Sequence, residues 1–169
     1  MKRQILYLIT GGLLCSASLF ADQQVPWQDP SVNGINREPA CAHFIPFSSE
    51  AKALSNDLSG NERRVSLDGT WKFLYSKNIE ACPTDFYKPG FNVKKWKDIQ
   101  VPGSWELQGF DAPIYTDVKY PFPPNPPFVP ADYNPVGAYV REFTVPESFK
   151  GMDIFLDFEG VESAFYCWV

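Results

Sequence analysis

The sequence of 169 residues contains a single histidine, His43, and no closely spaced pair of cysteines. Its cysteines are Cys15, Cys41, Cys82 and Cys167, and none of them forms the Cys-x-x-Cys pattern of zinc or redox sites. His43 therefore has no companion from its own neighbourhood, and we predict no metal site and no cofactor in this chain. The spacing leaves open whether any two of the last three cysteines form a disulfide.

Positive charge is also scarce. The sequence has 15 basic and 20 acidic residues, which gives a net charge of −5. Nucleic acids and anionic membrane surfaces both require clustered positive charge on a binding protein. We therefore expect neither as a partner, and we interpret the basic cluster at 94–97 as a solvated turn.

No hydrophobic run is long enough to cross a bilayer comfortably. The run from Ile5 to Leu14 follows two basic residues and precedes small residues up to Ala21, a pattern typical of a cleaved secretory signal. We predict a signal peptide over residues 1–21, export to the periplasm or the exterior, and no membrane attachment after its removal. Three other processing sites stay open: cleavage after Ala17, cleavage after Ser18, and lipid attachment at Cys15.

Amphipathic helices are absent from the remaining chain, whereas short alternating segments are frequent. Residues 22–64 contain four prolines and are expected to form an extended arm with one helical turn over Ser49–Leu54. Alternating apolar residues predict five strands. The first two flank an Asp68-Gly69 turn and contain Val65 and Leu67, and then Trp71, Phe73 and Tyr75. The other three contain Ile99 and Val101; Tyr139, Phe143 and Val145; and Met152, Ile154, Leu156 and Phe158. We expect Trp71, Phe73 and Trp168 in the core.

Residues 163–169 are apolar on both faces, which predicts a strand buried on both sides. The predicted fold is all-β, a jelly-roll β-sandwich over residues 65–169. Because the sequence stops inside this apolar strand, we expect the sandwich to be incomplete and the chain to be the front part of a longer protein.

A long loop over residues 102–130 separates the predicted strands. Eight of the 16 prolines lie between Pro113 and Pro135, so the segment cannot be a helix or a central strand. Its aromatic residues nevertheless favour burial, which excludes a disordered spacer. An ordered loop of this length is usually part of a functional site.

Seven blocks of the sequence occur in one colinear order. They are NREP at 36–39, SLDGTWKF at 66–73, VPGSWE at 101–106, GFDAPIYTDVKYP at 109–121, NPPFVP at 125–130, NPVGAY at 134–139 and FEGVESAF at 158–165. Together they resemble the N-terminal part of the large β-galactosidases of glycoside hydrolase family two. The resemblance covers most of residues 36–168.

The resemblance implies a sugar-binding domain that precedes immunoglobulin-like domains and a catalytic barrel. In the family, two barrel glutamates perform retaining hydrolysis of terminal β-D-galactose, so we expect no catalytic residue in this chain. The resemblance also implies a β-galactoside or oligosaccharide substrate, contacts with downstream domains and homo-oligomers of the whole protein. Mg²⁺ and Na⁺ are expected only in that whole protein.

The candidate substrate-binding residue is Asp117. In the family an asparagine usually follows the Ile-Tyr-Thr motif and contacts galactose hydroxyls, and this sequence has Asp117 there. An ionised aspartate only accepts hydrogen bonds, whereas asparagine also donates them. The alternative is an Asx-turn residue that stabilises the loop. Tyr115 is a weaker candidate; it and Trp105 suit either stacking on a sugar ring or, more commonly, pinning the loop to the sandwich.

Other polar residues have simpler interpretations. Glu159 and Glu162 resemble a glycosidase carboxylate pair, but a turn between strands explains them better. We expect His43 on the surface or at an interface, and Arg141 paired with Asp157 across the sheet.

Two other functions fit the same residues. The sandwich and aromatic loop also suit a non-catalytic carbohydrate-binding module, or the related β-glucuronidases and β-mannosidases. An assembly role for the arm at 22–64 is a further interpretation.

Overall fold

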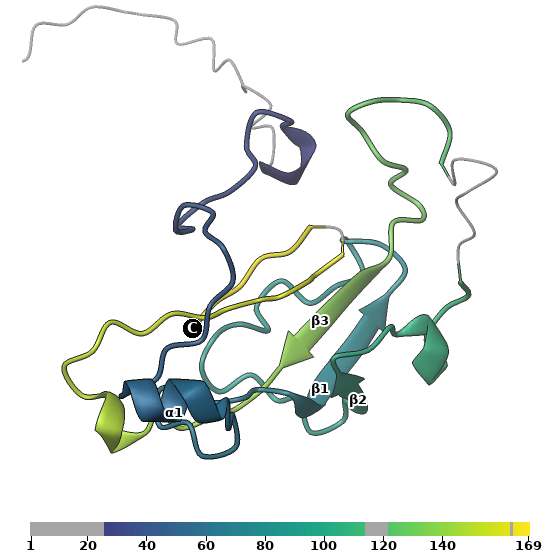
Figure 1. Ribbon diagram of the computed structural model, residues 1–169. Helices are drawn as coiled ribbons and strands as arrows, with labels where there is room; N and C mark the ends of the chain where they lie inside the picture. Colours follow the sequence, from purple (N-terminus) through teal and green to yellow (C-terminus); the bar gives the residue numbers. More distant parts are fainter. Residues whose placement is uncertain (1–25, 114–121, 163) are drawn as a thin grey trace, which may run out of the picture.

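A three-stranded antiparallel sheet forms the centre of the molecule in the computed structural model, which describes residues 26–113, 122–162 and 164–169. Its strands are β1 (Gly69–Ser76), β2 (Lys97–Val101) and β3 (Val136–Val140), in the order β2-β1-β3 (Figure 1). The other described elements are short: helix α1 (Glu50–Ser55) and the 3-10 turns η1 (Pro26–Gln28), η2 (Glu106–Gln108) and η3 (Glu147–Phe149). The regular structure is thus mainly β, as predicted.

The large alternating side chains of β1 face the core, as the sequence predicts. Trp71 pairs with Ile99 of β2, and Phe73 pairs with Tyr139 of β3. Phe73 and Ile99 are each 1% exposed and form the centre of the core with Ala138. The predictions of strands at 71–75 and 99–101, and of Phe73 as a core residue, are confirmed; Trp71 is only partly buried.

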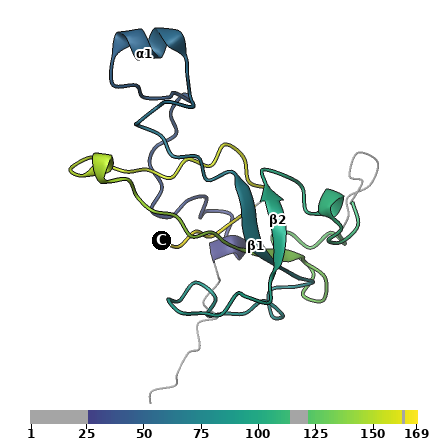
Figure 2. The same cartoon turned by 90° about the horizontal axis from the view of Figure 1, so that it is seen from below.

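The arm contains the predicted helical turn as α1, far from the sheet in the view of Figure 2. Ser49 is its N-cap and accepts a hydrogen bond from the Lys52 backbone N–H. The Lys52 ammonium also donates to Glu62 at 2.7 Å. This contact and a hydrogen bond from the Ser48 hydroxyl lower the pKa of Glu62 to about 2.

Two predicted strand regions need correction near the sheet. Val65 and Leu67 precede β1, which begins at Gly69, and they pair with no other strand of the described chain. At the other side β3 ends at Val140, so Phe143 and Val145 lie outside it and are exposed. Alternation in the sequence did not predict where strand pairing ends.

The two C-terminal strand predictions are also wrong. The segment 152–158 and the described residues of 163–169 are extended but make no ladder with another strand in the described chain. Trp168 is 49% exposed and stacks on Tyr87 at 4.8 Å instead of entering the core. An extended segment becomes a strand only where a neighbour satisfies its backbone groups.

None of the helices among the described residues has the length and apolar character needed to cross a membrane.

Candidate functional site

The loop predicted to bind sugar is described at both ends but not at its middle. Residues 114–121, which include the candidates Tyr115 and Asp117, lie outside the described residues. The two flanking segments, 102–113 and 122–135, are called the loop base below. Its contacts determine where the loop leaves the sheet and where it returns.

Trp105 attaches the first half of the loop base to the sheet. Its ring lies 6.0 Å from Phe73 and 6.0 Å from Tyr75, both on β1. Phe110 adds an edge contact of 4.7 Å to Phe73. The interpretation of Trp105 as a residue that pins the loop is therefore confirmed, since aromatic packing of this kind fixes both position and orientation.

Gly137 of β3 makes this packing close. A methyl group built on Gly137 would lie 2.6 Å from Trp105 Cζ3 and 2.7 Å from Phe73 Cε2. No real Cβ tolerates such distances, so the two rings occupy the space that any other side chain would need. Glycine at this position permits the close contact between the loop base and the sheet.

Asp111 links both ends of the loop base to β1. Its carboxylate accepts hydrogen bonds from the Tyr75 hydroxyl at 2.5 Å and the Tyr133 hydroxyl at 2.8 Å. The backbone N–H of Ala112 donates to the other carboxylate oxygen at 2.8 Å. Asp111 itself has a φ of +65°, a left-handed conformation that short polar residues tolerate better than most.

These hydrogen bonds change the acidity of all three side chains. The Tyr75 hydroxyl holds the pKa of Asp111 below its usual value, so the carboxylate stays ionised. Burial and the neighbouring carboxylate raise the pKa of Tyr75, and the hydrogen bond to Asp111 raises that of Tyr133. Both phenols therefore remain protonated donors at neutral pH.

The second half of the loop base returns to the end of β1. The Asn134 backbone N–H donates to the Lys77 carbonyl at 2.9 Å, and the Phe128 N–H donates to the Asn125 carbonyl at 2.7 Å. Here the chain surrounds an open hollow of about 200 Å³. Its lining is mostly apolar and consists of Pro123, Asn125, Phe128, Val129 and Pro130.

Arg141 lies at a second hollow, of about 350 Å³, which Trp71 and Lys72 of β1 also line. Its guanidinium donates to the Thr70 carbonyl, while its Nε is buried without a hydrogen-bond partner in the described part of the chain. The predicted Arg141–Asp157 pair is therefore wrong. Arg141 directly follows β3, the strand that pairs with β1, and this position brings its guanidinium to the carbonyl of Thr70 on β1.

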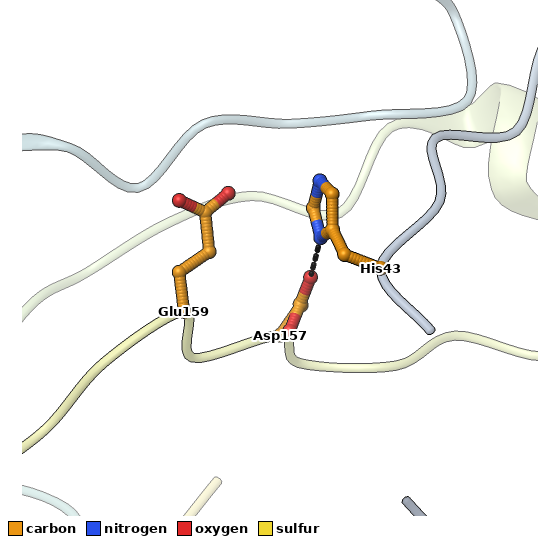
Figure 3. A group of neighbouring side chains, drawn as sticks. All are labelled: His43, Asp157 and Glu159. Carbon is orange, nitrogen blue, oxygen red and sulfur yellow. Dashed lines mark ion pairs between the residues drawn. The ribbon is translucent and has the colours of Figure 1, made fainter. Parts of the chain in front are cut away.

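His43 is exposed, as predicted, and its Nδ1 lies 3.6 Å from an oxygen of Asp157. Figure 3 shows Glu159 beside this pair, and ligand atoms of the three side chains lie within 4.8 Å of one another. Sequence spacing did not reveal this group, because His43 belongs to the arm and the carboxylates lie near the C-terminus. Glu162 is exposed and is not part of it.

Among the described residues, the three remaining cysteines are free thiols. Cys41 and Cys167 are exposed, whereas Cys82 is partly buried and its pKa is raised by that burial. None of the three is among the residues that hold the loop base on β1, so we assign the thiols no role at this site.

Comparison with known proteins places these features in a family context. Residues 65–169 match the family model described as "Glycosyl hydrolases family 2, sugar binding domain". The loop base and all three strands lie inside this region.

The curated relatives are similar over a longer part of the chain. A β-galactosidase of Priestia megaterium is 41% identical over 145 residues, 83% of this chain and 14% of the relative. A β-galactosidase of Psychromonas ingrahamii is 43% identical over 84% of this chain and 13% of its own length. One of Photobacterium profundum is 46% identical over 86% and 14%, respectively. The chain thus spans about one seventh of the length of these relatives.

Proposed function

The chain belongs to glycoside hydrolase family 2 through its sugar-binding domain, and from this premise we propose that it forms the N-terminal domain of an exported β-galactosidase. The parent protein would hydrolyse terminal non-reducing β-D-galactose residues by a retaining mechanism. Its two catalytic glutamates would lie in sequence beyond this chain. The relatives named β-galactosidase, matched over more than four fifths of the chain, carry this proposal.

The proposed role of the domain is to supply one side of the galactose pocket. Asp111 and Trp105 hold the loop base on β1, and the loop between them and Tyr133 carries Asp117. A loop fixed at both ends loses less entropy when it meets a sugar. Asp117 would then accept hydrogen bonds from galactose hydroxyls.

The aspartate at 117 has a consequence for catalysis. A negative charge near a catalytic carboxyl raises the pKa of that carboxyl, because the ionised form is then repelled. A general acid with a raised pKa stays protonated to higher pH. We therefore propose that Asp117 shifts the alkaline limb of the activity profile upward relative to an Asp117→Asn variant.

We further propose that the small sheet is one part of a jelly-roll sandwich completed by downstream sequence. The large apolar side chains of the C-terminal segment are exposed in the described chain, among them Ile154, Phe155 and Leu156. An exposed apolar patch of this kind is typical of a surface that another part of the protein covers. We also expect the parent protein to form homo-oligomers and to bind Mg²⁺ or Na⁺. The proposed mechanism does not depend on either property.

The test is hydrolysis of nitrophenyl glycosides by the full-length protein and by the present chain. We expect the full-length protein to cleave the β-galactoside in preference to the β-glucuronide and β-mannoside, and the chain alone to be inactive. Full-length Glu159→Gln and Glu162→Gln variants should retain activity. Turnover by the chain alone that either substitution abolishes would overturn the proposal.

The family description as a sugar-binding domain also favours a second candidate, an autonomous carbohydrate-binding module. Calorimetric titration of the chain with galactosides separates the two. Tight binding by the chain alone supports a module, whereas no binding fits a domain that supplies only one side of a pocket.

A further inference from the structure

We propose that His43, Asp157 and Glu159 form a binding site for a divalent transition-metal cation such as Zn²⁺. The site joins the arm to the C-terminal segment. Asp157 and Glu159 are two residues apart, and their side chains leave the chain on the same side, toward the imidazole of His43 (Figure 3). This arrangement offers one nitrogen and two carboxylate ligands at a single point of the surface.

The distance between His43 and Asp157 fits two ligands of one ion. Their nearest atoms, Nδ1 and Oδ2, lie 3.6 Å apart, which is too long for a hydrogen bond. With metal–ligand bonds of about 2.0–2.2 Å, two ligand atoms of a tetrahedral ion lie about 3.3–3.6 Å apart. The ion would replace a weak direct contact with two coordinate bonds.

Glu159 completes the set with little movement. All three ligand atoms lie within 4.8 Å of one another, whereas opposite ligands of an octahedral ion are about 4.2 Å apart when the bonds are about 2.1 Å long. The side chain of Glu159 is exposed, so its χ angles are free to close that gap. Exposure also leaves the remaining coordination positions to water.

The charges around the site favour a cation. Two carboxylates lie beside each other here (Figure 3), and no lysine or arginine of the described residues forms an ion pair with either of them. A divalent ion would neutralise the unmatched charge.

The ligand types select the class of ion. Imidazole nitrogen suits zinc and its first-row neighbours, whereas Mg²⁺ and Ca²⁺ prefer sets made only of oxygen. We therefore expect Zn²⁺ to bind, and excess Mg²⁺ or Ca²⁺ not to displace it. Because the ligands come from the arm and from the other end of the chain, the ion would restrict the motion of the arm.

The test is Zn²⁺ binding measured by competition with a chromogenic chelator, using the purified chain and the full-length protein. We expect one saturable site in the wild type. The variants His43→Ala, Asp157→Asn and Glu159→Gln should each weaken binding at least about tenfold, since even outer-shell partners of metal ligands are worth about 10–100-fold in affinity. Circular dichroism would establish that each variant retains its fold.

Two matched variants control for other ligands. Asp153→Asn removes an exposed carboxylate of the same segment outside the group, and Cys41→Ser removes the exposed thiol nearest to His43 in sequence. Both should bind Zn²⁺ as the wild type does. The proposal is overturned if the wild type shows no saturable binding, or if Cys41→Ser abolishes binding that Asp157→Asn and Glu159→Gln leave intact.

A second readout follows the arm itself. Bound Zn²⁺ should slow limited proteolysis between residues 26 and 48 in the wild type and in Asp153→Asn, but not in Asp157→Asn. Equal protection in all three proteins would show that the ion acts elsewhere and would contradict the proposal.

Discussion

The Tyr133 hydroxyl donates a hydrogen bond of 2.8 Å to the Asp111 carboxylate, and this bond joins the two ends of the loop base. Asp111 precedes the loop segment that contains Asp117, and Tyr133 follows it. The Tyr75 hydroxyl, on β1, donates to the same carboxylate oxygen. One carboxylate thus connects the beginning of the loop, its end and the central strand.

Removing the Tyr133 hydroxyl should impair substrate binding without unfolding the protein. In full-length Tyr133→Phe we expect kcat/KM for a nitrophenyl β-galactoside to fall about 3–10-fold, which corresponds to the roughly 1 kcal/mol of one net hydrogen bond. The loss should appear mainly in KM, because Tyr133 acts through the loop. Tyr87→Phe is the control, since Tyr87 stacks on Trp168 and not on the loop base. Equal losses in both variants would argue against a role for this bond.

The Asp111 carboxyl should titrate below its usual range. Its pKa is lowered by the Tyr75 hydroxyl, so its stabilising contribution is present at neutral pH and disappears as the pH falls from the ordinary carboxyl value through the lowered one. Carbon-13 NMR of the side-chain carboxyl measures this titration directly. Tyr75→Phe and Tyr133→Phe should each raise the pKa of Asp111, and a normal pKa in the wild type would contradict the described contacts.

Alanine at Gly137 should destabilise the fold. Its methyl group would overlap the rings of Trp105 and Phe73, and overpacking of this kind costs about 1–3 kcal/mol. Urea denaturation followed by tryptophan fluorescence measures the change. Gly160→Ala is the matched control, because no atom lies within 4 Å of a methyl group built there. If both substitutions changed stability equally, the close packing at Gly137 would not be the cause.

Local patterns predicted the parts of the fold that depend on neighbours in sequence. The alternation of Trp71, Phe73 and Tyr75 predicted β1, and the stretch Ser49–Leu54, which follows the last proline of the arm, predicted α1. Both depend on interactions within a few residues, namely a pleated face and an N-cap.

The failures share a different cause. Met152 to Phe158 alternate as clearly as β1, but alternation says nothing about whether a partner strand is present. Likewise, the ion pair of His43 with Asp157 joins distant segments, and no spacing rule predicts it. The hydrogen bonds of Asp111 with Tyr75 and Tyr133 were missed for the same reason. The positive φ of Asp111 is nevertheless typical of an aspartate in a loop.

Asp117 provides the most direct test of the proposal that this domain contacts the substrate. Full-length Asp117→Ala should be compared with Asp132→Ala, which removes an exposed carboxylate from the same loop region. We expect kcat/KM for the nitrophenyl β-galactoside to fall about 10–100-fold in Asp117→Ala, because a charge-assisted hydrogen bond to a hydroxyl is worth about 1.5–3 kcal/mol. Asp132→Ala should remain near the wild-type value. Wild-type kcat/KM in a folded Asp117→Ala protein would contradict the proposed role of the loop.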